Sequence, residues 1–156
     1  MSASKKHRIR LIGRREFVNI PELGIAGIEA KIDTGAYTSS LHCEKINIAV
    51  EDGREVLYFT IEPGEGSREF RFENFAQKKI KNSFGEMEER YVIKTAVNMG
   101  KKSIRSVISL SNRDNMKYPL LIGRRLLKSK FLIDVSRIHT GGIGMKRLLK
   151  EIRNKI

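Results

Sequence analysis

The feature that most constrains the fold is a series of short β-prone runs separated by residues typical of turns. Each run alternates apolar and polar residues or is rich in β-branched residues, which is the pattern of a half-buried strand. Asp52-Gly53 and Met99-Gly100 are examples of the turns between the runs. Many short strands at this spacing predict an all-β barrel or sandwich. The expected strands cover residues 9–20, 25–33, 45–50, 55–62, 68–75, 89–97 and 103–109.

Helical patterning appears only late in the sequence. Residues 123–129 predict one short helix, and apolar residues near the C-terminus repeat at helical spacing. A basic amphipathic helix is therefore expected in residues 141–156. It could dock on its own domain or on a partner subunit, or it could contact RNA or a membrane surface. Its apolar residues are Met145, Leu148, Leu149, Ile152 and Ile156, and its basic residues are Lys146, Arg147, Lys150, Arg153 and Lys155.

The length of 156 residues predicts one compact domain over residues 9–140, preceded by a basic tail over residues 1–8. The single cysteine, Cys43, cannot form an intrachain disulfide, and the N-terminus lacks the apolar stretch of a secretory signal. No apolar run approaches the roughly 20 residues that span a bilayer. These features predict a cytoplasmic protein without a membrane segment.

The chain is strongly basic, with 31 Lys and Arg residues against 18 Asp and Glu residues and a formal net charge of +13. Part of this charge is expected to be ordinary solvated surface. The net excess favours anionic partners, and nucleic acid, a ribosome surface and an acidic peptide all fit it.

Two short motifs carry the candidate chemistry. Asp33-Thr34-Gly35-Ala36 follows the apolar strand end Ala30-Lys31-Ile32. Alone it is a common turn sequence, because Asp and Gly are frequent in turns. About ninety residues later, Pro119 to Ile122 runs into Gly123-Arg124-Arg125-Leu126-Leu127. The presence of both motifs makes a chance turn a much weaker explanation than it would be for either motif alone.

Together the two motifs resemble aspartic peptidases of the retroviral type, in which an Asp-Thr-Gly-Ala loop is followed near the C-terminus by an apolar-apolar-Gly-Arg strand and a short helix. More closely, four stretches resemble a bacterial family whose members carry the name ATP-dependent zinc protease. That family is associated with RimK-type ligases, which add glutamate to a ribosomal protein. The four stretches are Gly13 to Glu16, Ala30 to His42, Lys81 to Gly85 with Glu89-Arg90, and Tyr118 to Leu127.

The resemblance implies a retropepsin-like barrel and an active site made of two carboxylates that share one proton. The chain has one Asp-Thr-Gly loop, so the second carboxylate is expected from Asp33 of another copy in a C2 homodimer. Thr34 would brace the two loops, and Gly35 would permit close approach of the backbone. Ala36 cannot hydrogen-bond the carboxylate, which predicts a dyad suited to near-neutral pH.

The resemblance also implies an acidic peptide as substrate, such as a glutamate tail. Arginine and lysine side chains bind carboxylates well, so several are candidates for substrate contact. The sequence departs from the retroviral pattern at Tyr37, where an Asp commonly pairs with the arginine of the Gly-Arg segment. Arg124 is therefore expected to pair with Glu16 or another carboxylate, or to face the substrate. The candidate contacts are Arg15, Lys31, Arg90, Arg124 and Arg125, with His42 as a residue that shapes the site.

Two further classes stay open at this point. A binding module with the same fold would hold acidic peptide or ribosomal RNA without cleaving it. A zinc-dependent peptidase would need converging ligands, but His7, His42, Cys43 and His139 lack the spacing of a zinc motif. A phosphate-binding loop for ATP is not visible either. The sequence therefore predicts no cofactor, and it predicts that the hairpin around residues 82–85 covers the active-site cleft.

Overall fold

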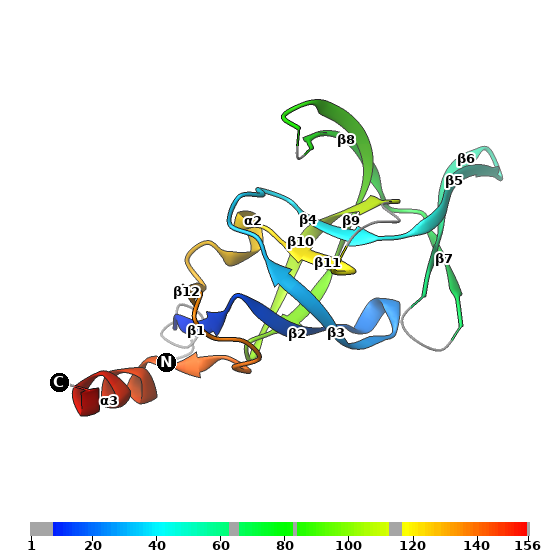
Figure 1. The fold of residues 1–156 in the computed structure, drawn as a ribbon. Helices are drawn as coiled ribbons and strands as arrows, with labels where there is room; N and C mark the ends of the chain where they lie inside the picture. Colours follow the sequence, from blue (N-terminus) through cyan, green and yellow to red (C-terminus); the bar gives the residue numbers. More distant parts are fainter. Residues whose placement is uncertain (1–7, 63–65, 83, 113–116, 156) are drawn as a thin grey trace.

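A computed structural model describes residues 8–62, 66–82, 84–112 and 117–155 (Figure 1). The fold is mainly β, as the sequence predicted. The elements are β1 (Arg10–Gly13), β2 (Arg15–Ile20), the 3-10 turn η1 (Pro21–Leu23), β3 (Ile25–Ile32), β4 (Ser39–His42), β5 (Glu44–Glu51), β6 (Arg54–Ile61), β7 (Arg68–Phe72), β8 (Ala76–Lys81), β9 (Met87–Met99), β10 (Lys102–Ser111), β11 (Leu120–Ile122), α2 (Arg124–Leu127), β12 (Phe131–Asp134), β13 (Ile143–Gly144) and α3 (Met145–Lys155).

The largest sheet closes on itself. Its strand order is β10-β4-β11-β3-β2-β9-β8, and an additional pairing between β10 and β9 completes a barrel. Strand β8 extends the sheet beyond this closure. Along β2 the side chains of Glu16, Val18 and Ile20 are buried while their neighbours are more exposed, which is the alternation expected of a barrel strand. Val18 and Ile20 belong to an apolar core that also includes Leu41 and Leu120 of the barrel and Phe59 of β6 in a neighbouring sheet.

Two three-stranded sheets flank the barrel. Strands β5, β6 and β7 form an antiparallel sheet that lies at the right of Figure 1. The other sheet has the order β12-β1-β13, with β12 parallel and β13 antiparallel to β1. In that sheet a strand from the beginning of the described chain lies between two strands from its end.

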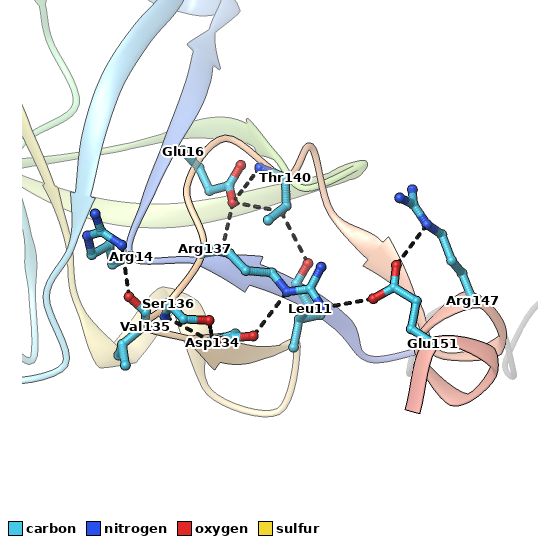
Figure 2. Close-up of polar contacts among 11 residues, drawn as sticks. Leu11, Arg14, Glu16, Asp134, Val135, Ser136, Arg137, Thr140, Arg147 and Glu151 are labelled. Carbon is cyan, nitrogen blue, oxygen red and sulfur yellow. Dashed lines mark hydrogen bonds and ion pairs between the residues drawn. The ribbon is translucent and has the colours of Figure 1, made fainter. Parts of the chain in front are cut away.

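A buried carboxylate fastens the segment between β12 and β13 to the barrel. Glu16 is 1% exposed and accepts hydrogen bonds from the Gly13 amide at 2.7 Å, the Thr140 hydroxyl at 2.7 Å and the Gly141 amide at 3.0 Å. Arg137 adds ion pairs with Asp134 at 3.0 Å and with Glu151 of α3 at 2.8 Å. Figure 2 shows how these contacts tie the end of the chain to β1 and β2.

The β8–β9 hairpin projects away from the barrel at the top of Figure 1. The Asn82 side chain organises its turn, because Oδ1 accepts hydrogen bonds from the amides of Phe84 and Glu86, both at 3.0 Å. Ser83 lies outside the described residues. Phe84 is 88% exposed at this tip, so the hairpin presents an apolar side chain to its surroundings.

The structure corrects several predicted boundaries. The strand predicted at 9–20 is two strands in different sheets, because the chain turns at Arg14. A side chain at Gly13 would place its Cβ 2.3 Å from the Arg137 carbonyl oxygen, so the chain is tightly packed at this break. The short helix is α2, within the predicted 123–129, and α3 forms where the C-terminal helix was predicted. Strands β4, β8, β12 and β13 were not predicted.

Neither of the helices in the described residues is long and apolar enough to cross a membrane. Residues 1–7, which make up nearly all of the predicted basic tail and include His7, lie outside the described residues, as does Ile156 of the predicted C-terminal helix.

Candidate active site

The Asp33 loop begins where β3 ends. Strand β3 runs parallel to β11, with Ile32 opposite Ile122, so the two motifs found in the sequence leave adjacent strands at the same edge. The Asp33 amide donates to the Ile122 carbonyl oxygen at 2.8 Å. Within the loop, the Gly35 amide donates to Asp33 Oδ1 at 3.0 Å. These contacts fix both the backbone and the carboxylate of Asp33.

Gly123 fits where a larger residue would not. A Cβ there would lie 2.7 Å from the Tyr37 carbonyl oxygen and 2.9 Å from the Ala36 carbonyl oxygen. The same two carbonyl groups accept hydrogen bonds from the amides of Arg124 at 2.8 Å and Arg125 at 2.9 Å. The Gly of the Gly-Arg motif therefore lets the start of α2 pack directly on the Asp33 loop.

Arg124 contacts that loop through its side chain as well. Its Nη1 donates to the Thr34 carbonyl oxygen at 2.9 Å, and its guanidinium carbon lies 5.8 Å from the centre of the Tyr37 ring. The expected pair with Glu16 is not formed, because Glu16 is buried and accepts hydrogen bonds from the Gly13 and Gly141 amides and from Thr140. Figure 2 shows the contact with Thr140. Tyr37 thus interacts with Arg124 from the position where the retroviral pattern has an Asp.

A groove of about 490 Å³ lies between the Asp33 loop and the β8 strand of the projecting hairpin. Among the described residues that line it, the cations are Lys79, Lys81, Arg90 and Arg124, and Asp33 is the single carboxylate. The hairpin predicted to cover the cleft therefore does border it, through Lys79 to Asn82. The other lining residues are Gly35, Ala36, Tyr37, Thr38, Ser40, Ile80, Asn82 and Leu121.

Arg90 is the most buried of these cations, at 8% exposure. Its Nε donates to Glu88 Oε1 at 2.6 Å, and its Nη2 contacts the same oxygen. Two guanidinium nitrogens of Arg90 thus contact one carboxylate of the same hairpin. Arginine makes this kind of charge-assisted contact with bound anions as well.

Four other predicted contacts lie outside the groove of this chain. Arg15 lies 3.8 Å from the Glu29 carboxylate, and His42 lies 3.9 Å from that of Glu44. Lys31 and Arg125 are exposed. Lys79 and Lys81 were missed, although the basic run at residues 78–81 next to the predicted hairpin was a usable signal.

Thr34 is exposed on the loop but is not among the residues that line the groove. Its predicted role, to brace two loops in a dimer, belongs to an assembly of two copies. That role stays a prediction.

His42, Cys43 and His139, which lie within the described residues, do not form a zinc site. No group of three His, Cys, Asp or Glu side chains gathers as metal ligands within the ranges that the structure describes. The Cys43 side chain is fully buried in the core, and burial raises the pKa of its thiol far above the ordinary value. Because metals bind the thiolate, this environment opposes coordination by Cys43.

Comparison with known proteins gives a family and two sets of relatives. The model of a family described as "RimB-like: Retropepsin-like aspartic endopeptidase RimB" matches residues 11–141. Probable alpha-L-glutamate ligases from Shewanella halifaxensis and Desulfotalea psychrophila are 36% identical over 130 residues and 37% identical over 129 residues. The matches cover 81% and 80% of this chain and 28% of each ligase, so the chain spans less than a third of their length.

Among solved structures, the crystal structure of Lpg0085 from Legionella pneumophila, a protein of unknown function, is similar, with a TM-score of 0.69 and 27% identity. The match covers 84% of this chain and 97% of that protein. The prediction of a mainly β, retropepsin-like barrel is confirmed by the family match and by the closed sheet. The family description names an aspartic endopeptidase. It gives no support to the word zinc in the family name, ATP-dependent zinc protease, to which the sequence motifs pointed.

Proposed function

Because the chain belongs to the RimB-like family of retropepsin-like aspartic endopeptidases, we propose that it hydrolyses peptide bonds with Asp33 as its catalytic carboxylate. The observation that carries this proposal is the groove, in which Asp33 is the one carboxylate among cationic side chains. The Gly35 amide and the Ile122 carbonyl group hold Asp33 in place at the edge of the barrel.

Asp33 can perform only half of the reaction. One carboxylate must take a proton from the attacking water while a second, protonated carboxyl group donates to the oxygen of the scissile carbonyl. The groove supplies one such group per chain, so we assign the second to Asp33 of another copy in a C2 dimer. In that arrangement Thr34, which is exposed on the loop, would face its equivalent across the axis.

The charge of the groove supports an acidic substrate. Four cationic side chains line it against one carboxylate, and an extended chain of acidic residues would place its carboxylates beside them. The Arg90–Glu88 contact shows that a carboxylate fits against Arg90, so a substrate carboxylate can take the place of Glu88. The names of the longer relatives contain glutamate ligase, and a glutamate-rich chain is the substrate that we propose.

The β8–β9 hairpin would act as the cover of the substrate. Its strand β8 already borders the groove, and Phe84 and Met87 near its tip are 88% and 61% exposed. Closure over a bound peptide would bury these apolar side chains and exclude water from the carboxylates, which strengthens the electrostatic contacts there.

The test is hydrolysis of a glutamate-tailed peptide by the purified protein, followed by mass spectrometry. Asp33→Asn should abolish cleavage and retain the fold, whereas Asp52→Asn in an exposed turn is the matched control and should cleave normally. A binding module would hold the peptide without cleaving it, in the natural protein as well as in the variant, and that result would refute the proposal.

A mixing experiment tests the shared site. If each active dimer needs two Asp33 side chains, equal amounts of natural and Asp33→Asn chains, exchanged at random, should retain about a quarter of the activity of the same total amount of natural protein. Retention of about half would show that each chain works alone. Light scattering on the same samples gives the oligomeric state.

A further inference from the structure

A second basic region lies apart from the groove. A recess of about 470 Å³ is lined by Arg10 of β1, Lys101 of the β9–β10 turn, and Lys146, Arg147 and Lys150 of α3. None of its residues lines the groove at Asp33, and in Figure 1 α3 lies at the end of the molecule away from the β8–β9 hairpin. Its other lining residues are Gly142, Ile143 and Gly144.

The recess carries uncompensated positive charge. Among the described residues, Arg10, Lys101, Lys146 and Lys150 form no ion pair with a carboxylate, while Arg147 is paired with Glu151 at 3.3 Å. Arg10 Nη2 donates to the Gly142 carbonyl oxygen at 2.9 Å, which fixes one cation at the wall. The pKa of the neighbouring Lys102 is lowered, first by burial and then by the charges of Arg10 and Lys130, so cations crowd this part of the surface.

The position of α3 argues against a lipid surface. Met145 and Leu148 are partly buried against the domain, and Glu151 holds the helix through its ion pair with Arg137 at 2.8 Å (Figure 2). Among the described residues of the helix, only Leu149 and Ile152, at 49% and 45% exposure, are left for insertion. The cations of the recess also surround a hollow, whereas a helix that lies on a membrane must present its cations on an outer face.

We propose that this recess binds the sugar–phosphate backbone of single-stranded RNA, independently of the peptidase activity. The cations come from three separate elements, β1, the β9–β10 turn and α3, and can contact successive phosphates of one strand that crosses the recess. Gly142 is buried, and its amide and carbonyl groups are bound to Thr140 and Arg10, so the partly exposed Gly144 is the place where a ribose can approach and its 2′-hydroxyl can hydrogen-bond to the backbone. None of the described residues that line the recess has an aromatic side chain on which bases could stack, which predicts binding without sequence preference.

The test uses fluorescence anisotropy with a labelled RNA oligonucleotide of mixed sequence and the full chain. Lys101, Lys146 and Lys150 are exposed, so their combined replacement by Ala should preserve the fold, which circular dichroism checks. This variant should bind RNA about tenfold or more weakly, and the slope of log affinity against log salt should fall by about 2, at roughly 0.7 per lost phosphate contact. Hydrolysis of the glutamate-tailed peptide should be unchanged.

The matched control removes the same charge elsewhere, at the exposed residues Lys45, Arg54 and Lys94, and should change RNA affinity less than about twofold. Equal losses in both variants would overturn the proposal, because they would show that net charge alone attracts RNA. Equal affinity for DNA of the same sequence would overturn the assignment to RNA. Binding to anionic vesicles or to the acidic peptide that is lost only in the recess variant would assign the recess to those partners instead.

Discussion

Arg124 donates a hydrogen bond from Nη1 to the carbonyl oxygen of Thr34 at 2.9 Å, across 90 residues of sequence. The same guanidinium lies over the Tyr37 ring. In the retroviral pattern an aspartate at the position of Tyr37 takes this arginine. Here the Thr34 carbonyl oxygen and the Tyr37 ring contact the arginine instead. The charge of Arg124 is therefore not neutralised by a carboxylate within the loop and is available to the groove.

Arg124→Ala should lower turnover of an acidic peptide. The substitution removes the contact with Thr34, and a loop that shifts by about 1 Å can cost up to about a hundredfold in rate. The stability loss should be about 1 kcal/mol, the typical contribution of one hydrogen bond. Steady-state kinetics and denaturant unfolding measure the two effects. Arg125→Ala is the control, since that side chain lies outside the groove, and an equal loss of rate there would contradict a specific role for Arg124.

Arg90→Lys should chiefly raise the Michaelis constant for acidic peptides. Lysine keeps the charge but cannot present two nitrogens to one carboxylate as Arg90 does to Glu88. Loss of one such contact with the substrate should weaken its affinity by about tenfold or more. Kinetics with peptides that have progressively fewer glutamates provides the measurement, and the effect should shrink as the acidic tract shortens. A defect confined to kcat would instead place Arg90 in the transition state.

Glu16→Gln should destabilise the fold by about 1–3 kcal/mol. The buried carboxylate acts only as a hydrogen-bond acceptor, and its donors are the Gly13 amide, the Gly141 amide and Thr140. The NH₂ group of a glutamine would face one of these donors and leave it without an acceptor. Thermal or denaturant unfolding measures the loss. Glu29→Gln is the control, because that carboxylate is about 30% exposed and its loss should cost less than about 1 kcal/mol. A loss at Glu16 no larger than at Glu29 would contradict the proposed role as a fastener.

Asp134 should make stability depend on acid pH. Hydrogen bonds from the Ser136 hydroxyl, the Ser136 amide and Arg137 lower the pKa of Asp134 from 3.8 to about 2. A lowered pKa in the folded state means that the stabilisation is complete above about pH 4 and is lost as the pH falls through about 2. Asp134→Asn should therefore be less stable than the natural protein at pH 7, and the difference should vanish towards pH 2.

A titration of the Asp134 carboxyl resonance by NMR gives the pKa directly. Ser136→Ala removes the hydroxyl donor at 2.6 Å and should move the midpoint upward. An unchanged midpoint in that variant would show that the Ser136 amide and Arg137, and not the hydroxyl, set the pKa.

Cys43 should resist thiol reagents in the folded protein. Its side chain is fully buried, and burial raises the pKa of the thiol, so little thiolate is present and reagent cannot reach it. Labelling with a chromogenic disulfide should become rapid only on unfolding. Lys94→Cys adds an exposed thiol as a positive control, and the folded variant should report one reactive group out of two. Rapid labelling of the natural protein would indicate local opening around β4 and β5.

The sequence predicted the centre of the site better than its surroundings. Asp33 and Gly123 stand at the ends of two apolar runs, and a short motif at the end of a strand stays in place once the two strands pair. The helix at Met145–Lys155 was also readable, because its apolar period is regular over three turns. These features depend on local pattern.

The rest depends on long-range contacts that leave little trace in the sequence. The break between β1 and β2 at Arg14 depends on the distant Arg137 backbone, and β13 is two residues long. Strand β8 carries Lys78, Lys79 and Lys81 beside the predicted hairpin, but it lacks the apolar alternation that marks a half-buried strand. Lys79 and Lys81 were missed for that reason. The groove itself exists only because the hairpin bends towards the Asp33 loop.

The place of β1 between β12 and β13 has a consequence for biosynthesis. Arg10 of β1 pairs with Gly144 of β13, and its side chain donates to the Gly142 carbonyl oxygen, 132 residues further along the chain. A ribosome delivers β1 long before β13. During translation the first strand must therefore wait, with both of its edges unpaired, while the strands of the barrel emerge. The sheet β12-β1-β13 can therefore form only after all strands of the barrel have been synthesised. A nascent chain stalled before Ile143 would expose an unpaired edge of β1 to neighbouring polypeptides.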